Sequence, residues 1–155
     1  MFPSLRIAYA VLPPGLVASF VHAVSLTARS VNALTQAVLA DFLSEGHFDR
    51  YVRRTRKIYA SRALAFEHAA AQHWQNLIDV PTAANGLDVV GHLMHLNERA
   101  AVAQLKAAGI HAAPLSRYVH RHNQPPGLVM GFAPFNEEEI ERAAQQVAVA
   151  LREAE

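Results

Sequence analysis

The chain has 155 residues, of which 52% are hydrophobic and 17% charged, with a formal net charge of +1 when histidine is neutral. This composition is that of a globular protein, and the near-zero charge gives no electrostatic footprint for nucleic acid or an anionic membrane. The chain has no cysteine, which excludes disulfides, thiolate catalysis and cysteine-ligated zinc and fits a reducing compartment.

The first segment predicts a buried strand. Residues 7–12 form a nearly continuous apolar run with β-branched and aromatic members, and Pro13-Pro14-Gly15 ends it. Such a run suits a strand covered on both faces in a parallel sheet, yet only six residues precede it. Residues 7–28 also lack Asp, Glu, Lys and Arg, as in a signal peptide or spanning helix, but the prolines would break such a helix. We therefore expect the second half of a larger domain.

Three helices are expected next. Apolar residues at helical spacing predict helices over about 16–28 and 33–45, the second ended by Gly46. The longest periodic segment runs from about Phe48 to Trp74, roughly 40 Å at ~1.5 Å per residue, enough to connect two subdomains. Its polar face would carry a basic run: Arg50, Arg53, Arg54, Arg56, Lys57 and Arg62. No helix-turn-helix pattern surrounds this run, so a solvated face, or one facing a neighbouring subunit or domain, is favoured over DNA contact.

From residue 76 onward the pattern predicts a small α+β layer. Short strands are expected over 77–80, 87–93 and 128–133, with a strand or extended piece over 110–115 and a turn through Asn85-Gly86. Asn97 is expected to cap a helix that ends at about Ala108. Asn136 followed by Glu139 predicts a capping box for a last helix that ends at about Arg152. The expected order is β-β-α-β-β-α.

Few residues suggest chemistry by themselves. Among the nine histidines, His92 and His95 would point to opposite faces of a strand, and His120 and His122 lie in a polar loop, so no metal site is expected. The chain has neither a Gly-x-Ser-x-Gly elbow nor a glycine-rich phosphate loop. Arg6 is different, because an arginine directly before a buried strand is well placed to hold an anionic group with its two-pronged guanidinium.

Several segments together carry a resemblance that extends from Phe2 to the last helix. They are Phe2–Pro13, Gln36–Phe48, Arg53–Tyr59 with Arg62, Ala84–Leu87, Pro114–Ser116 with Tyr118, and Gly131–Ala133 leading into Glu137–Ile140. With these segments the chain resembles the C-terminal half of the aminotransferase-like domain of MocR-type transcriptional regulators of the GntR family. The fold of that domain is that of class I/II (fold type I) pyridoxal-phosphate (PLP) aminotransferases.

The resemblance implies an α/β chain in three parts. Residues 1–46 would be a remnant of the aminotransferase large domain, 47–75 a long interdomain helix, and 76–155 the α+β small domain. In the family, PLP forms a Schiff base with a lysine a few residues before the segment that matches Phe2–Arg6, and the arginine matching Arg6 binds the cofactor phosphate. The only lysines here are Lys57 and Lys106, and neither occupies the matching position. No catalytic residue is therefore expected in this chain.

Two further positions depart from the family pattern. Many aminotransferases have a substrate-carboxylate arginine where this chain has Val129, and Arg117 and Arg121 are nearby cations that could substitute for it. Asp88 stands where a histidine is expected. The winged helix that binds DNA in the family has no counterpart in these residues.

The resemblance predicts a fragment of a cytoplasmic PLP-dependent regulator that is not catalytic alone. Its partners would be a second copy or the missing N-terminal half, and the parent family responds to small amino-acid-like effectors. Two alternatives stay open at this point. One is the C-terminal half of a genuine class I/II aminotransferase that is active only with an N-terminal half. The other is a stand-alone dimerisation or interaction module.

Overall fold

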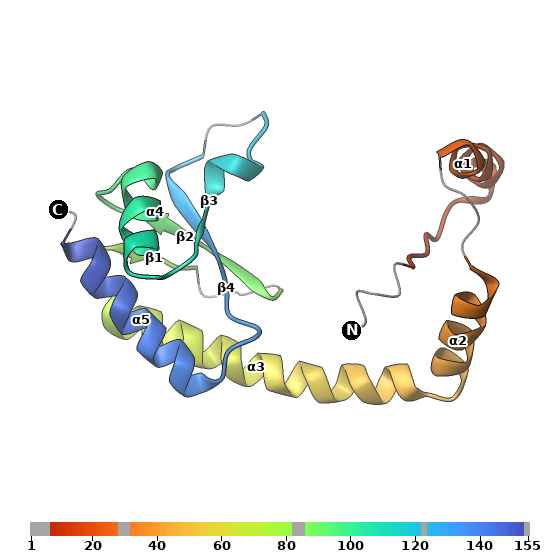
Figure 1. Ribbon diagram of the computed structural model, residues 1–155, viewed down its shortest axis with the longest axis horizontal. Helices are drawn as coiled ribbons and strands as arrows, with labels where there is room; N and C mark the ends of the chain where they lie inside the picture. Colours follow the sequence, from red (N-terminus) through yellow and green to blue (C-terminus); the bar gives the residue numbers. More distant parts are fainter. Residues whose placement is uncertain (1–6, 28–31, 82–85, 122–123, 154–155) are drawn as a thin grey trace. The chain divides into compact units, whose positions relative to one another are not determined.

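The computed structural model describes residues 7–27, 32–81, 86–121 and 124–153. The chain divides into two compact units, Met1–Arg54 and Thr55–Glu155. The boundary between the units lies within the long helix α3 (His47–His73), which Figure 1 shows in yellow.

The first unit contains two complete helices, the first turns of α3 and no strand among its described residues. Residues 7–13 have no regular secondary structure, and the side chains of Tyr9 and Val11 are 86% and 88% exposed. The prediction of a buried strand over 7–12 is therefore wrong for this structure. The physical reason is that a strand needs hydrogen-bonded neighbours, and the described residues of this unit offer none.

The two helices of the first unit confirm the periodicity. Helix α1 (Pro14–Thr27) begins with a proline, whose fixed φ and missing N–H suit the first helical position. Helix α2 (Ala33–Ser44) is capped by Asn32, whose side chain accepts a hydrogen bond from the Leu34 N–H at 2.8 Å. The predicted stop at Gly46 is also confirmed, because Gly46 has a φ of 71° that favours glycine.

Neither α1 nor α2 has a buried residue. Both helices nevertheless carry large apolar side chains, and these are exposed. The exposed set on the two helices is Leu16, Val17, Phe20, Val21, Val24, Leu26, Leu34, Val38 and Leu43. As far as its residues are described, the first unit thus has helices with an apolar surface and no buried core.

Helix α3 has the predicted bounds, but one residue of its basic run lies elsewhere than expected. Arg62 was predicted on the solvated face; instead it is half-buried, and its Nη1 donates a hydrogen bond to the carbonyl of Ala133. The reason is helical geometry: Arg62 lies four residues before the buried Phe66 and so shares its face. Arg53, Arg54, Arg56 and Lys57 are exposed, as predicted.

The second unit is built on one four-stranded antiparallel sheet (Figure 1). Its strands are β1 (Ile78–Asp79), β2 (Asp88–Leu93), β3 (Ala113–Pro114) and β4 (Gly127–Gly131), in the spatial order β1-β2-β4-β3. The helices are α4 (Glu98–Ala107), α5 (Glu137–Arg152) and the short 3₁₀ helix η2 (Leu115–Tyr118). The predicted order β-β-α-β-β-α is confirmed, and the expected piece over 110–115 is reduced to the two residues of β3.

The predicted helix caps of this unit are confirmed. The Asn97 side chain accepts from the Ala100 N–H at 2.9 Å and begins α4. At the start of α5, the Asn136 side chain accepts from the Glu139 N–H at 2.9 Å, while the Glu139 carboxylate accepts from the Asn136 N–H at 2.7 Å. In the predicted turn, Gly86 has a φ of 144°, and Asn85 lies outside the described residues.

All buried apolar side chains of the described residues belong to the second unit. They come from the C-terminal half of α3, one face of the sheet, α4 and α5, and form a single cluster. Three rings form its aromatic part: Phe66 meets Trp74 edge-on at 5.4 Å and Phe132 at 5.6 Å. The indole N–H of Trp74 donates to the carbonyl of Ala144 at 2.8 Å, which joins α3 to α5.

Polar contacts also join α3 to α5. His73 Nε2 lies 2.6 Å from Glu141 Oε1, and the Ser61 hydroxyl donates to Glu137 Oε1 at 2.6 Å. The hydrogen bond with His73 lowers the pKa of the Glu141 carboxyl, and the one from Ser61 lowers the pKa of Glu137. The helices are therefore held together at their exposed edges as well as through the core.

The uneven distribution of the core leads to a prediction for amide exchange. We expect residues 76–155 to be more protected from hydrogen exchange than residues 1–46, because the buried apolar cluster found among the described residues lies in the second unit. Exchange mass spectrometry of the intact 155-residue chain, with peptides resolved along the sequence, measures this difference. Uniform protection along the chain would contradict the description of the first unit.

Candidate functional site

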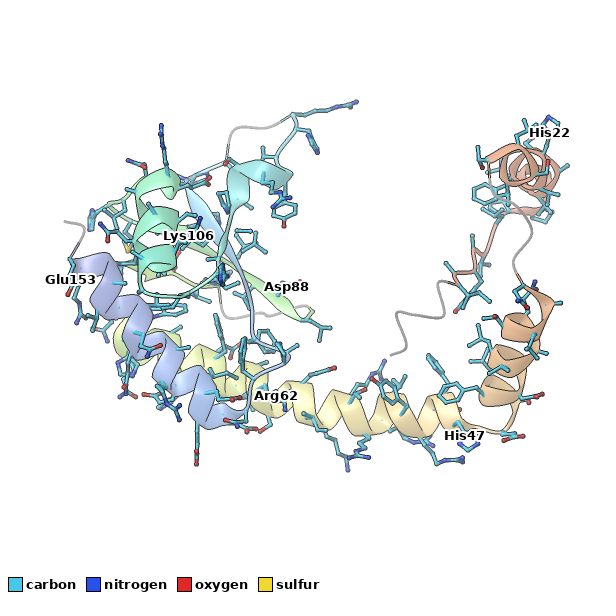
Figure 2. All side chains as sticks on the ribbon, viewed as in Figure 1. His22, His47, Arg62, Asp88, Lys106 and Glu153 are labelled. Atoms are coloured by element: carbon cyan, nitrogen blue, oxygen red, sulfur yellow. The ribbon has the colours of Figure 1, made fainter. Side chains whose placement is uncertain are left out.

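The sequence-predicted cofactor residues lie in different parts of the chain. Arg6 lies outside the described residues. Lys57 is exposed on α3, and Lys106 is exposed in the last turn of α4 (Figure 2). Within the described part of the chain, neither lysine side chain makes a hydrogen bond or an ion pair.

The sheet of the second unit has one buried face and one half-exposed face. Along β2, Val89, Gly91 and Leu93 are buried, whereas the alternating residues between them are exposed or half-buried. Because paired residues of antiparallel strands share a face, the register places four pairs on the half-exposed face: Asp88 with Gly131, Val90 with Val129, His92 with Gly127, and Asp79 with His92. We call this surface the open sheet face.

Val129 lies at the centre of the open sheet face. It pairs with Val90 of β2 on one side and with Ala113 of β3 on the other. Its neighbours across both strands are therefore apolar. At the position where the resemblance places a carboxylate-binding arginine in many aminotransferases, this chain presents a small apolar surface.

Asp88 and His92 lie toward the two ends of the open sheet face. A β-carbon on Gly131 would meet Asp88 Oδ1 at 2.9 Å, so the carboxylate lies over this glycine. A β-carbon on Gly127 would lie 3.4 Å from His92 Nδ1 and 3.1 Å from Leu115 Cδ2. His92 Nδ1 is buried and has no hydrogen-bond partner among the described residues. The glycines thus leave the room that these two side chains occupy.

Glu98 fixes the loop beside the open sheet face. Its Oε1 accepts from the Gly127 N–H at 2.8 Å and its Oε2 from the Ser116 N–H at 3.2 Å. Burial raises the pKa of the Glu98 carboxyl, but the hydrogen bonds from the Ser116 hydroxyl and from the two backbone N–H groups outweigh it and lower the pKa below 4.5. Sequence reasoning missed this residue, whose only local signal is its place directly after the Asn97 cap.

The cations expected near Val129 are on the surface. Arg117 is exposed in η2, and Arg121 is exposed just after it. Neither makes a hydrogen bond or an ion pair within the described part of the chain. Their role as substitutes for the missing arginine stays a prediction.

No group of three or more histidine, cysteine or acidic side chains gathers into a possible metal site among the described residues. His92 lies on β2 and His95 follows the end of that strand, whereas His122 lies outside the described residues. Within the same described ranges, no helix is long and apolar enough to cross a membrane.

Sequence comparison finds relatives among transcriptional regulators, although no protein-family model matches the chain. The probable rhizopine catabolism regulatory protein MocR of Rhizobium meliloti is 33% identical over 134 residues, which are 86% of this chain and 27% of that protein. The uncharacterised HTH-type transcriptional regulator YhdI of Bacillus subtilis is 24% identical over 151 residues, 97% of this chain and 32% of that protein. The chain spans about a third or less of the length of these curated relatives.

Solved structures with the same fold are aminotransferases. LysN, an α-aminoadipate aminotransferase from Thermus thermophilus solved with N-(5'-phosphopyridoxyl)-L-leucine, matches 98% of this chain with a TM-score of 0.87 and 22% identity. Kynurenine aminotransferase from Pyrococcus horikoshii matches 90% with a TM-score of 0.82 and 16% identity. The match covers 39% and 35% of those chains. Together with the regulator relatives, this confirms the predicted likeness to the C-terminal part of a MocR-type aminotransferase-like domain.

The contacts of Glu98 predict a pH-dependent contribution to stability. We expect Glu98→Gln to lower the free energy of unfolding by about 1–2 kcal/mol at pH 7, because an amide cannot accept all the hydrogen bonds that the carboxylate accepts. The folded-state pKa is lowered, so the contribution is full above pH 4.5 and is lost as the pH falls through the folded-state value. Urea unfolding at several pH values measures it. Glu138→Gln, on the first turn of α5, is the control. A difference in unfolding free energy between the unaltered chain and Glu98→Gln that is the same at pH 7 and pH 3 would contradict the assignment.

Proposed function

We propose that this chain is the C-terminal part of the PLP-dependent effector domain of a MocR-type GntR transcriptional regulator, and that it is not catalytic alone. The observation that carries the proposal is the conjunction of two likenesses over nearly the whole chain: regulators in sequence and aminotransferases in fold. In this role the regulator binds DNA through a domain that these residues do not include, and it acts in the cytoplasm.

The cofactor would be held jointly with other residues of the parent protein. When bound, PLP supplies an electron sink for reactions at an amino group, and it needs a lysine amine as its anchor. This chain would contribute Arg6 to the cofactor phosphate, by a charge-assisted pair of hydrogen bonds. The exposed positions of Lys57 and Lys106 support the proposal that the anchoring amine comes from elsewhere.

The effector would be a small amino-acid-like molecule. The apolar centre of the open sheet face, Val129 between Val90 and Ala113, supports a regulator that does not hold the effector carboxylate by an arginine at this position. Recognition of that carboxylate would then depend on other cations of the parent protein, with Arg117 and Arg121 as the candidates in this chain.

The exposed apolar side chains of α1 and α2 support a further part of the proposal. Helices of 12 and 14 residues without a buried side chain are marginal in water, so they need a covering surface. In the parent protein the rest of the aminotransferase large domain would cover them. In the chain alone, a second copy is the available cover, and a homodimer is the expected form.

The cofactor proposal predicts complementation. We expect PLP to give no saturable absorbance band at about 410–430 nm, the region of its covalent linkage to lysine, when it is added to this chain alone. A band should form when the chain is mixed with the remaining part of the aminotransferase-like domain of the Rhizobium meliloti regulator. In this mixture Arg6→Ala should weaken PLP binding about 10–100-fold, as expected for lost hydrogen bonds to a charged group. Arg117→Ala is the matched control and should change the affinity little. A saturable band with this chain alone, lost when Lys57 or Lys106 is replaced by arginine, would contradict the proposal.

The proposal that a second copy covers α1 and α2 predicts self-association. Sedimentation of the 155-residue chain should show a concentration-dependent dimer, and the double variant Phe20→Glu with Val24→Glu should shift it to monomer because both side chains lie exposed on α1. Val149→Glu, at an exposed apolar position on α5, is the control and should leave the dimer intact. A dimer lost in the control but kept in the α1 variant would place the interface on the second unit instead.

A further inference from the structure

Three hydrogen-bond donors converge on the carboxylate of Glu98. The Gly127 N–H donates to Oε1 at 2.8 Å, the Ser116 N–H donates to Oε2 at 3.2 Å, and the Ser116 hydroxyl donates to the same carboxylate. The donors belong to β4 and η2, and the carboxylate reaches them from the first residue of α4. We call these three donors the Ser116–Gly127 site.

The end of a strand pair explains why the Gly127 N–H turns to a side chain. The pairing of β3 with β4 ends where Pro114 lies opposite Leu128, because the chain continues from there into η2. Gly127 is the next residue along β4 and is buried. A buried N–H without an acceptor is costly. The Glu98 carboxylate supplies the acceptor that the strand pair no longer offers.

The Ser116–Gly127 site holds a negative charge with neutral groups. Neither of the two ion pairs found among the described residues includes Glu98. Converging backbone N–H groups bind anions in proteins, and the position of Glu98 in the first turn of α4 adds the favourable end of the helix dipole. A β-carbon on Gly127 would lie only 3.0 Å from the Gly91 carbonyl oxygen and 3.1 Å from Leu115 Cδ2, so close packing fixes this donor in place.

We propose that the Ser116–Gly127 site is a binding site for a small carboxylate, and that Glu98 occupies it as a built-in ligand. By filling the site, Glu98 fixes η2, which carries the exposed Arg117, to the start of β4. A free carboxylate enters only where the Glu98 side chain is absent, because an attached group has a far higher effective concentration than a solute. The site does not depend on PLP or on the first unit.

Removal of the carboxylate and its return as a solute test the proposal in the 155-residue chain. Glu98→Ala deletes Cγ, Cδ and both carboxylate oxygens, which are the heavy atoms of acetate. We expect amide exchange at Ser116 and Gly127, followed by NMR, to become about tenfold faster or more, as expected for lost hydrogen bonds to a charged group. Acetate should restore slow exchange saturably, with a dissociation constant of about 10–100 mM. Acetamide, which has the same shape without the charge, should not.

Matched proteins separate the site from effects of salt and of folding. In the unaltered chain, and in Glu138→Ala, whose exposed carboxylate lies in the first turn of α5, acetate should leave both amides unchanged. Glu98→Gln serves if Glu98→Ala does not fold. Its amide keeps the shape of the side chain but offers one acceptor oxygen instead of two, so at least one of the two backbone amides should exchange several-fold faster. Acetate should not restore it, because the side chain still fills the site.

Three results would overturn the proposal. Restoration by acetamide that equals restoration by acetate would show that the site selects shape and not a carboxylate. An effect of acetate in Glu98→Ala that does not saturate, or that equals the effect of chloride at the same concentration, would show a general action of salt. Exchange of both the Ser116 and the Gly127 amides that stays unchanged in Glu98→Ala or in Glu98→Gln would show that Glu98 is not their acceptor.

Discussion

Trp74 connects the parts of the second unit that are far apart in sequence. Its indole N–H donates to the carbonyl of Ala144 on α5, and its ring meets Phe66 within α3, which in turn contacts Phe132 after β4. A buried indole N–H without a partner would be costly, so this hydrogen bond fixes the position of α5 along α3. The buried side chains of the sheet, α4 and α5 pack around the aromatic rings in a single cluster.

The two units differ in whether their helices bury their apolar side chains. Helices α3, α4 and α5 bury apolar residues in the core of the second unit, whereas α1 and α2 bury none of their residues. Sequence and fold comparisons relate this chain to about a third of much longer proteins. A part of a larger domain would present an apolar surface without a core. The exposure of α1 therefore agrees with the proposed role in a regulator.

Local signals in the sequence predicted most of the fold. The helix bounds follow from periodicity, from the caps Asn97 and Asn136 and from Gly46, because each of these acts within a few residues of the chain. The strand over 7–12 failed because strand formation depends on neighbours that local sequence does not reveal. Arg62 and Glu98 were missed for a related reason, since their partners Ala133 and Gly127 lie 71 and 29 residues away. The role of Arg6 rests on the resemblance alone.

The edge strands of the sheet determine how readily strands of other molecules can add to it. The outer strands are β1, with two residues, and β3, which includes Pro114 and therefore lacks one backbone donor. Short edges and proline discourage the addition of further strands, which is the usual route from an exposed sheet to amyloid-like aggregates. The second unit is thereby protected against polymerisation through its sheet. The part of this chain that favours aggregation is instead the exposed apolar surface of α1 and α2.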